Sequence, residues 1–345
     1  MIELWEGFES EQDSNIKGFK FTQVGGTFQN VNTIARRQGG RSALLSANGS
    51  STFYARLTRD MKPTTQKTIG IGVRFGRVSP KNLPFMRIGN GAQAIELLTD
   101  ESNRLAVKHS DTNVILGVSE FSLAPLTWYY IQAMVDLTAG SVSACIGTRE
   151  VISLAGLNIP ILNNLLTTLT FQAQPADNIV LQLWLDDLYV ADNRDPATGY
   201  LGVVSIYGAL PNADGDVMTF KRNGGSDSPY KYVNEPSASV LNYLYGDDID
   251  AKATFKMSPV PQGQVIGANL FAYVARSDQG SGISKYKLLL RAPDGSEYLS
   301  EERVLSSAPW TTDNLLLFTN PFTNAPLTAD DLNALQPGIL VTQVE

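Results

Sequence analysis

Apolar and polar residues alternate with a period of two in several stretches, the pattern of a strand that buries one face. The alternation covers residues 69–75, 128–136 and 266–274. Gly, Pro, Asn and Asp recur between such stretches, where they favour tight turns. The Leu/Ile-rich segment 154–169 leaves two alternatives open, one helical turn or a strand pair broken by a loop. Since long helical patterns are scarce, the sequence predicts an all-β protein and favours a β-sandwich.

A helix start signal occurs near the end of the chain. Thr328 can cap the first turn, and Asp331 follows at the third helical position. Just upstream, the strand over 286–291 is expected to pair with 266–274 across the turn at 279–282. These features predict a compact β-unit that contains one short helix.

Turn formers concentrate in the middle of the chain and indicate a boundary between domains. The apolar strand pattern of 184–190 gives way to the Asp-, Asn-, Pro- and Gly-containing stretch 191–199. We therefore expect a sandwich domain over 1–195, a crossover and linking segment over 196–250, and a C-terminal β-domain over 251–345.

Composition and charge narrow the function classes. The chain has 345 residues, enough for two domains, and its net charge is −7, most of it carried after residue 200. Binding to a phosphate backbone needs clustered Lys and Arg, which are missing, so we expect no direct nucleic-acid contact. No apolar run approaches the ~18 residues of a membrane helix, and the first residues lack a signal-peptide pattern. We expect neither membrane insertion nor export.

Three short segments resemble a signature of tailed-bacteriophage virion proteins. They are Asp-Asp-Leu-Tyr-Val at 186–190, Leu-Gly-Val-Val at 201–204 and Leu-Pro-Asn-Ala-Asp-Gly-Asp at 210–216. Proteins of this kind pair a concanavalin-like (laminin-G-like) jelly roll with a C-terminal β-domain. One departure is Asp248, which stands where the family pattern has Lys. The resemblance implies that fold, a virion location after synthesis in the host bacterial cytoplasm, and a homo-oligomer in contact with other virion proteins.

The single cysteine and single histidine exclude several kinds of chemistry within one chain. An intramolecular disulfide and a Cys/His zinc site are both impossible. Cys145 lies in a small apolar strand and is expected to be a buried, inert thiol. The chain has no Gly-x-Ser-x-Gly motif whose serine His109 could activate. We expect His109 to be a solvated turn residue.

Some acidic residues are candidates for glycosidase carboxylates, because concanavalin-like folds include such enzymes. Asp186 and Asp187 are adjacent, so on a regular strand they would face opposite sides and accept backbone hydrogen bonds. Glu9, Glu11 and Asp13 would share one face of a strand, but an exposed polar loop is the favoured interpretation. We therefore expect no enzyme activity, and a carbohydrate-active enzyme (a depolymerase or glucanase) is the rival function.

We expect no cofactor and no metal, and calcium is the one metal for which the sequence offers candidate ligands. Carboxylate and amide oxygens suit calcium, and one turn carries three of them at Asp192, Asn193 and Asp195. Such residues are also frequent in turns for backbone reasons.

Four aromatic residues are candidates for stacking on a sugar ring or for an interface: Trp128, Trp184, Tyr200 and Tyr207. A host surface glycan is therefore an additional expected partner, although aromatic residues in sandwiches are more often core. The favoured function is a non-enzymatic virion structural protein, first a tail or tail-tip component and second a capsid decoration protein. A secreted lectin would need an export signal.

Overall fold

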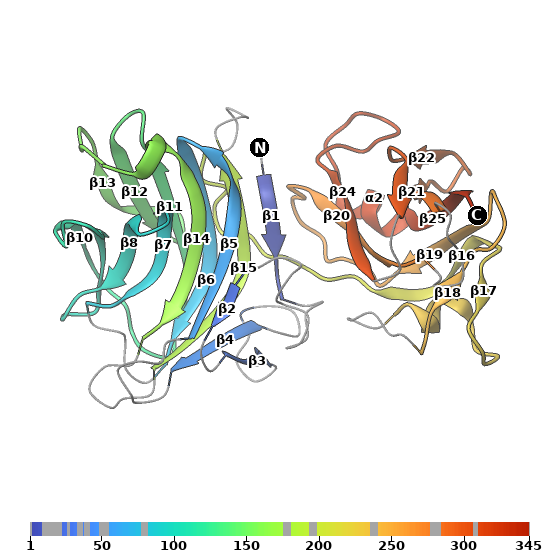
Figure 1. The fold of residues 1–345 in the computed structure, drawn as a ribbon, viewed down its shortest axis with the longest axis horizontal. Helices are drawn as coiled ribbons and strands as arrows, with labels where there is room; N and C mark the ends of the chain where they lie inside the picture. The colour runs from blue at the N-terminus through green and yellow to red at the C-terminus, as the bar shows by residue number, and fades with distance from the viewer. Residues whose placement is uncertain are drawn as a thin grey trace. The chain divides into compact units, whose positions relative to one another are not determined.

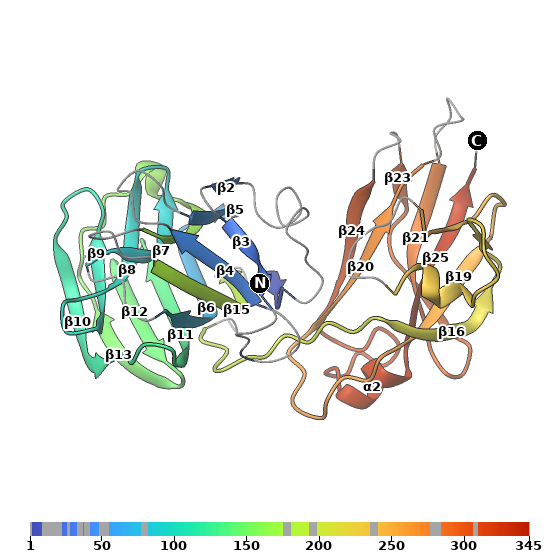
Figure 2. The same ribbon diagram turned by 90° about the horizontal axis from the view of Figure 1, so that it is seen from below.

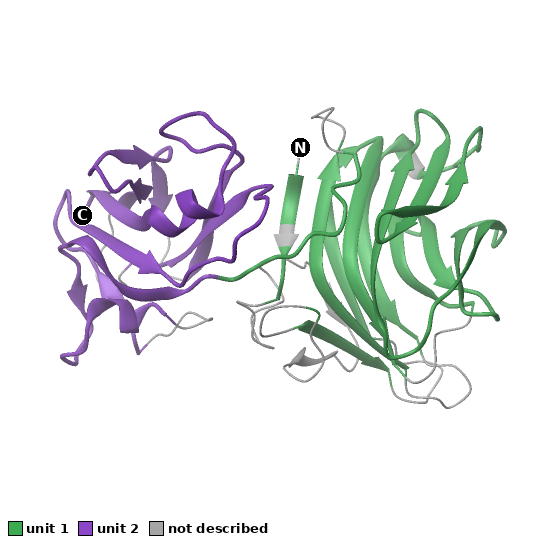
Figure 3. Ribbon diagram, turned by 180° about the vertical axis from the view of Figure 1, so that it is seen from behind, with its two compact units in different colours: residues 1–208 green, residues 209–345 purple. Residues whose placement is uncertain are grey.

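The computed structural model divides into two compact units, residues 1–208 and residues 209–345 (Figure 3). It describes residues 2–8, 23–25, 28–32, 37, 42–47, 55–76, 82–174, 181–192, 199–234, 241–276, 284–305 and 310–344. The fold is all-β, as the alternation predicted: a jelly-roll β-sandwich followed by a smaller β-unit.

The sandwich consists of two antiparallel sheets stacked face to face (Figures 1 and 2). The first sheet has the order β13 (Arg149–Leu154), β12 (Ser141–Ile146), β11 (Trp128–Asp136), β6 (Gln66–Phe75), β15 (Leu181–Asp192), β4 (Ser42–Ala47) and β3 (Phe28–Asn32), and β1 (Ile2–Glu6) pairs with β15. The second has the order β10 (Ile115–Ser122), β9 (Arg104–His109), β8 (Gln93–Thr99), β7 (Pro84–Asn90), β14 (Leu166–Ala173), β5 (Ala55–Thr64) and β2 (Gln23–Gly25).

The hydrophobic core of this unit lies between the two sheets. The apolar positions predicted over 69–75 are all buried, and the ring of Phe75 on β6 meets that of Phe85 on β7 edge-on at 5.2 Å. Each such side chain contributes roughly 1.5–3 kcal/mol on full burial. Packing of the two inner faces therefore holds the sandwich together.

Gly70 occupies a position in β6 that no other residue could fill. Its neighbours across the sheet are Tyr189 on β15 and Gln132 on β11. A Cβ at Gly70 would overlap the Tyr189 ring, which lies over the glycine on the face away from the core. The missing side chain lets the Tyr189 hydroxyl reach Oε1 of Gln132 at 2.8 Å.

The segment 154–169 contains the predicted helical turn, whereas its flanking strands do not form a pair, because β13 and β14 belong to different sheets. Strand β13 ends at Leu154, a loop follows, and a single 3-10 turn, η1 (Leu162–Asn164), precedes β14. Positive φ angles at Asn163 and Asn164 suit asparagine. The loop before η1 borders the pocket discussed below.

The second unit has one large sheet and two small ones. The large sheet has the order β16 (Pro211–Met218), β19 (Lys252–Met257), β25 (Gln336–Gln343), β21 (Ser284–Arg291) and β22 (Glu297–Leu299), with β23 (Arg303–Leu305) paired to β21. The small sheets are β20 (Ala268–Val274) with β24 (Thr311–Leu317), and β17 (Lys221–Arg222) with β18 (Leu244–Tyr245). A second 3-10 turn, η2, covers Pro229–Tyr232. The helix α2 (Ala329–Ala334) begins after Thr328 with a capping box, as predicted.

One predicted strand pairing is wrong. The strand over 286–291 does not pair with 266–274: β21 pairs with β25, and β20 pairs with β24. Instead, Leu270 and Val274 of β20 pack against Tyr286 and Leu288 of β21 in one apolar cluster. The two strands therefore meet through their apolar side chains, which partly buries the alternating apolar side of β20.

The predicted linking segment 196–250 belongs partly to the second unit. Its strand β16 pairs with β19, and β17 and β18 pair with each other. The division between the units falls at 208/209, inside that segment. Among the described residues, no helix has both the length and the apolar character needed to span a membrane.

Candidate functional site

Residues 200–206 lie along the face of the first sheet that points away from the core. The Tyr189 hydroxyl accepts a hydrogen bond from the Leu201 N–H at 3.3 Å. Oε1 of Gln132 accepts from the Gly202 N–H at 3.0 Å. Burial raises the pKa of the Tyr189 phenol above its ordinary value. This part of the family-like signature thus fixes the end of the first unit to its own sheet.

Asp187 and Arg37 form the buried centre of the same attachment. Asp187 has φ 50° at a bulge of β15, and its side chain accepts the Ile206 N–H at 2.6 Å and pairs with the Arg37 guanidinium. The guanidinium also donates to the Val204 carbonyl at 2.8 Å, and Asp186 accepts the Arg37 N–H at 3.0 Å. Both carboxylates accept backbone hydrogen bonds, as expected. Contrary to the alternation of a regular strand, both also contact Arg37, because the bulge interrupts that alternation.

The calcium candidates are only partly described. Asp192 lies buried at the end of β15, with its carboxylate 3.9 Å from the Lys67 ammonium, which also pairs with Glu3. Asn193 and Asp195 lie outside the described residues, as do the acidic candidates Glu9, Glu11 and Asp13. In the described part of the chain, no group of three His, Cys, Asp or Glu side chains could hold a metal ion.

The four aromatic candidates do not come together on one exposed surface. Trp128 packs against Trp184, which is only 7% exposed and has the Arg74 guanidinium 5.0 Å from its ring centroid. Tyr200 bonds to Ser143 through their hydroxyls at 2.6 Å. Ser143 pairs with a β11 residue six positions from Trp128, a separation of about 20 Å along the strand. Tyr207 is exposed at 47%.

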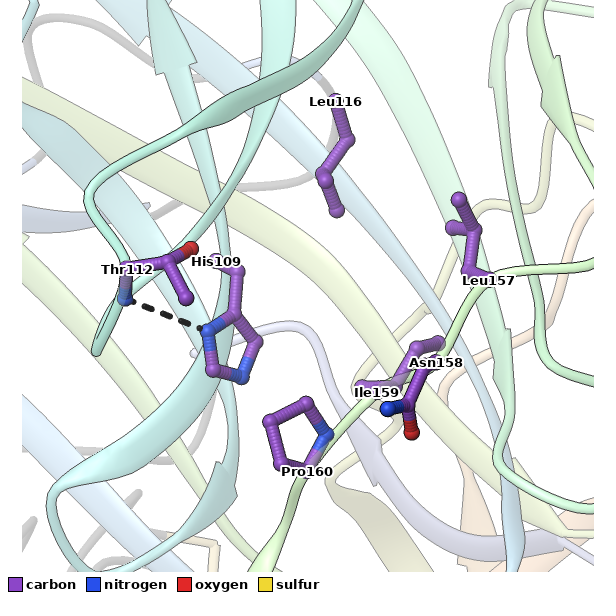
Figure 4. A pocket seen from close by; sticks show the side chains of 7 residues that line it. All are labelled: His109, Thr112, Leu116, Leu157, Asn158, Ile159 and Pro160. Atoms are coloured by element: carbon purple, nitrogen blue, oxygen red, sulfur yellow. Dashed lines mark hydrogen bonds between the residues drawn. The ribbon is translucent and has the colours of Figure 1, made fainter.

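His109 is not the solvated turn residue that was expected, because its side chain is only 3% exposed. It lines a pocket of about 200 Å³ between the β9–β10 turn and the loop before η1 (Figure 4). The other lining residues are Thr112, Leu116, Leu157, Asn158, Ile159 and Pro160. A sequence signal for this burial exists: Leu105, Val107 and His109 alternate along β9, and the first two are core residues.

The imidazole of His109 lies in the wall of this pocket. Its Nδ1 accepts a long hydrogen bond, 3.5 Å, from the Thr112 N–H. Nε2 is buried and has no hydrogen-bond partner among the described residues. In Figure 4 the ring lies between Thr112 and the Ile159–Pro160 stretch.

The turn and the loop that form the pocket are fixed by backbone hydrogen bonds. The His109 N–H donates to the Val114 carbonyl at 3.2 Å, and the Asn113 N–H donates to the His109 carbonyl at 3.0 Å. Asn113 has φ 55°, which asparagine tolerates. On the other side, the Leu157 N–H donates to the Gly140 carbonyl at 2.8 Å. Both walls of the pocket are therefore built before any ligand enters.

Strand β10, at an edge of the second sheet, carries a group of exposed apolar side chains. Five large hydrophobic residues on or beside it are between 38% and 54% exposed: Val114, Ile115, Val118, Phe121 and Leu126. Among the described strands β10 pairs only with β9, and that ladder shifts register twice, between Ile115 and Gly117 and between Val118 and Ser122. Exposed apolar side chains along one edge strand are typical of interaction surfaces.

Comparison with known proteins gives similarity to solved structures only. No protein-family model matches the chain, and no curated protein matches its sequence. A carbohydrate esterase from Shiga toxin-encoding bacteriophage phi24B is 15% identical, with a TM-score of 0.42, over 56% of this chain and 100% of its own. Domain 4 of an extracellular arabinanase from Geobacillus stearothermophilus is also 15% identical, with a TM-score of 0.40, over 56% and 92%.

Two further structures complete the comparison. The lectin UEA-II, complexed with galactose, is 8% identical with a TM-score of 0.36, over 51% of this chain and 95% of its own. A sialidase is 9% identical with a TM-score of 0.39, and the match spans only 19% of its length. At these scores the similarities carry no argument about the activity of this chain.

Proposed function

We propose that this chain is a non-enzymatic structural protein of a tailed-phage virion and that copies of it associate through the β10 edge. The observation that carries the proposal is the exposed apolar group on and beside β10. The family-like segments 186–190 and 201–204 support the virion assignment. A tail or tail-tip position is our first choice, and capsid decoration is the alternative.

The β10 edge suits contact through side chains. Its two register shifts interrupt the row of backbone groups that a continuous added strand would need. Ile115 and Val118 instead offer apolar surface, and Glu120 is the one charged residue within the strand. An apolar surface is complementary to itself, whereas a charged one repels its copy, so a second chain related by a two-fold axis fits this edge.

The contact is tested by measuring self-association with sedimentation velocity over a range of concentrations. Replacing Ile115 and Val118 together by Lys places two charges at the proposed interface, and we expect association to weaken by at least about tenfold. The control is Val304→Lys on β23, where a more exposed valine (56%) lies on the other unit and no effect is expected. A wild-type chain that stays monomeric throughout would contradict the contact.

The virion assignment is tested by immunogold labelling of purified phage particles with antibody to this chain. Gold at the tail tip is the expected result, and gold spread over the head would replace the tail position by capsid decoration. Particles without gold would overturn the assignment, whatever the result for the β10 edge. The two experiments can therefore fail independently.

A further inference from the structure

We propose that the side chains of Lys67 and Glu3 condense to an amide, an intramolecular isopeptide bond that joins β1 covalently to β6. The reaction needs no added reagent and releases one water. It takes place among residues of a single chain, within the first unit, and so does not depend on the β10 contact.

The first step of the argument is the position of the amine. Lys67 lies on the core side of β6, and its neighbours across the sheet are the core residue Val135 and the carboxylate residue Asp192. Its side chain is 0% exposed. A lysine is almost never fully buried unless it is paired, so the groups around this amine define what it can do.

The second step is a bulge that directs Glu3 toward the amine. The register of β1 against β15 shifts between Ile2 and Leu4, which makes Glu3 the extra residue of β1. Its side chain is only 7% exposed and pairs with the Lys67 ammonium. The two reacting groups are therefore held in contact, and groups positioned in this way react with effective molarities on the order of 10⁵–10⁸ M.

The third step is the presence of two assisting groups. Oε2 of Glu3 accepts the Lys62 N–H at 3.3 Å, which places a donor where negative charge develops as the amine adds to the carboxyl carbon. The Asp192 carboxyl hydrogen-bonds to Glu3 and lies 3.9 Å from Nζ of Lys67. It can therefore accept a proton from the amine and return one to the leaving oxygen.

The protonation of the two acids suits this role. Burial raises the pKa of the Glu3 carboxyl, and the hydrogen bond with Asp192 raises it as well, whereas Lys67 lowers it. Two carboxyl groups that share a hydrogen bond hold one proton between them, because two adjacent negative charges repel. The cluster then consists of one ammonium, one carboxylate and one neutral carboxyl, and its net charge is zero.

The reaction balances within this cluster. A bond forms between Nζ of Lys67 and Cδ of Glu3, and the bond from Cδ to Oε1 breaks. Two protons leave the nitrogen and depart with Oε1 as water, by way of Asp192, which ends with the proton it had at the start. Oε2 remains as the amide oxygen that accepts the Lys62 N–H.

The product also removes a buried pair of charges. An ammonium and a carboxylate that stay ionised at this depth retain the cost of their lost hydration, whereas an amide is neutral. An ion pair without a covalent bond is the alternative, and the mass of the chain separates the two.

The test is the intact mass of the full chain, measured under denaturing conditions. We expect a mass lower than that of the sequence by one water. Trypsin digestion should then give a branched peptide that joins Glu3 to Lys67. An unreduced mass would overturn the proposal, and so would a water loss located anywhere else, including a bond between Lys67 and Asp192.

Variants then connect the bond to its residues. Lys67→Met removes the amine and should restore the full mass. The matched control is Lys62→Met, at an exposed position whose backbone N–H is kept, and it should form the bond like wild type. Asp192→Ala should slow bond formation at least about tenfold, followed by mass in freshly purified protein. A Lys67→Met chain that still loses water, or a folded Asp192→Ala chain that reacts as fast as wild type, would refute the assigned roles.

Discussion

The Arg37–Asp187 pair determines, at the scale of single residues, where the first unit ends. The Asp187 carboxylate is almost fully buried, and it holds the Ile206 N–H as well as the guanidinium. Arg37 adds a second hydrogen bond to the Val204 carbonyl and lies 4.7 Å from the Tyr130 ring centroid. One buried ion pair therefore connects a strand, a distant residue of the chain and residues 204–206.

We predict that removing one charge of this pair lowers the free energy of unfolding more than removing both. Asp187→Asn leaves the Arg37 charge buried without its counter-charge and should lower the free energy of unfolding by about 3–5 kcal/mol. Combining it with Arg37→Met should recover part of that loss, because neither charge then remains. Urea unfolding of the four chains of this double-mutant cycle measures the coupling. Strictly additive losses would contradict the prediction.

His109 and Gly70 show what sequence patterns predict for single residues. The alternation of β9 placed His109 on the core side, but the expectation for an isolated histidine next to polar residues was a solvated turn. Four of the six other pocket residues come from 157–160, almost fifty residues away, and no local pattern predicts such a contact. The alternation over 69–75 puts Gly70 opposite the buried face, but no local pattern predicts the Tyr189 ring that covers it.

At the scale of elements, sequence patterns correctly predicted those features whose contacting residues are close together in the chain. The capping box of α2 involves residues only three apart: Thr328 accepts from the Asp331 N–H at 3.1 Å, and Asp331 accepts from the Thr328 N–H at 2.9 Å. The pairing of β20 and β21 failed because long-range packing decides it. Neighbouring strands that share an apolar core can pack as layers instead of forming a hairpin.

The cap gives a prediction about stability and pH. Thr328→Ala should lower the free energy of unfolding of the second unit by about 1 kcal/mol, because the Asp331 N–H loses its acceptor. Hydrogen bonds from Thr328 hold the pKa of Asp331 below its ordinary value. The resulting stabilisation is present above the unfolded carboxyl pKa of about 3.9 and is lost as the pH falls through the lower folded value.

Chemical unfolding of wild type and variants between pH 2 and pH 6 checks this prediction. Asp331→Asn should remove the acid-dependent part of the loss, whereas Asp330→Asn, in the same turn but outside the capping box, should leave it in place. If Thr328→Ala unfolds like wild type at every pH, the cap does not stabilise the unit.

At the scale of the whole molecule, each unit has its own sheets and its own apolar clusters. The sequence predicted two β-domains, but the positions of turn-forming residues do not indicate to which domain β16 belongs. Tertiary hydrogen bonds decide it: the Asp216 N–H donates to Oε1 of Gln336 at 2.8 Å, and the Val217 N–H donates to Oγ1 of Thr254 at 3.1 Å.

We therefore predict that a fragment of residues 209–345 folds by itself. Its melting temperature should lie within about 5 °C of the corresponding transition in the full chain, measured by calorimetry. The comparison is a fragment of residues 251–345, which lacks β16, β17, η2 and β18 and should be clearly less stable. Equal stability of the two fragments would show that residues 209–250 do not contribute to the unit.

The pairing of β1 with β15 has a consequence for synthesis. Ile2 lies opposite Ala191, so the two strands leave the ribosome with nearly the whole sandwich between them. At translation rates of about 5–20 residues per second, β1 waits roughly 10 to 40 s for its partner. Its apolar residues, Ile2 and Leu4, stay uncovered during that time, which makes β1 a natural substrate for chaperones during synthesis.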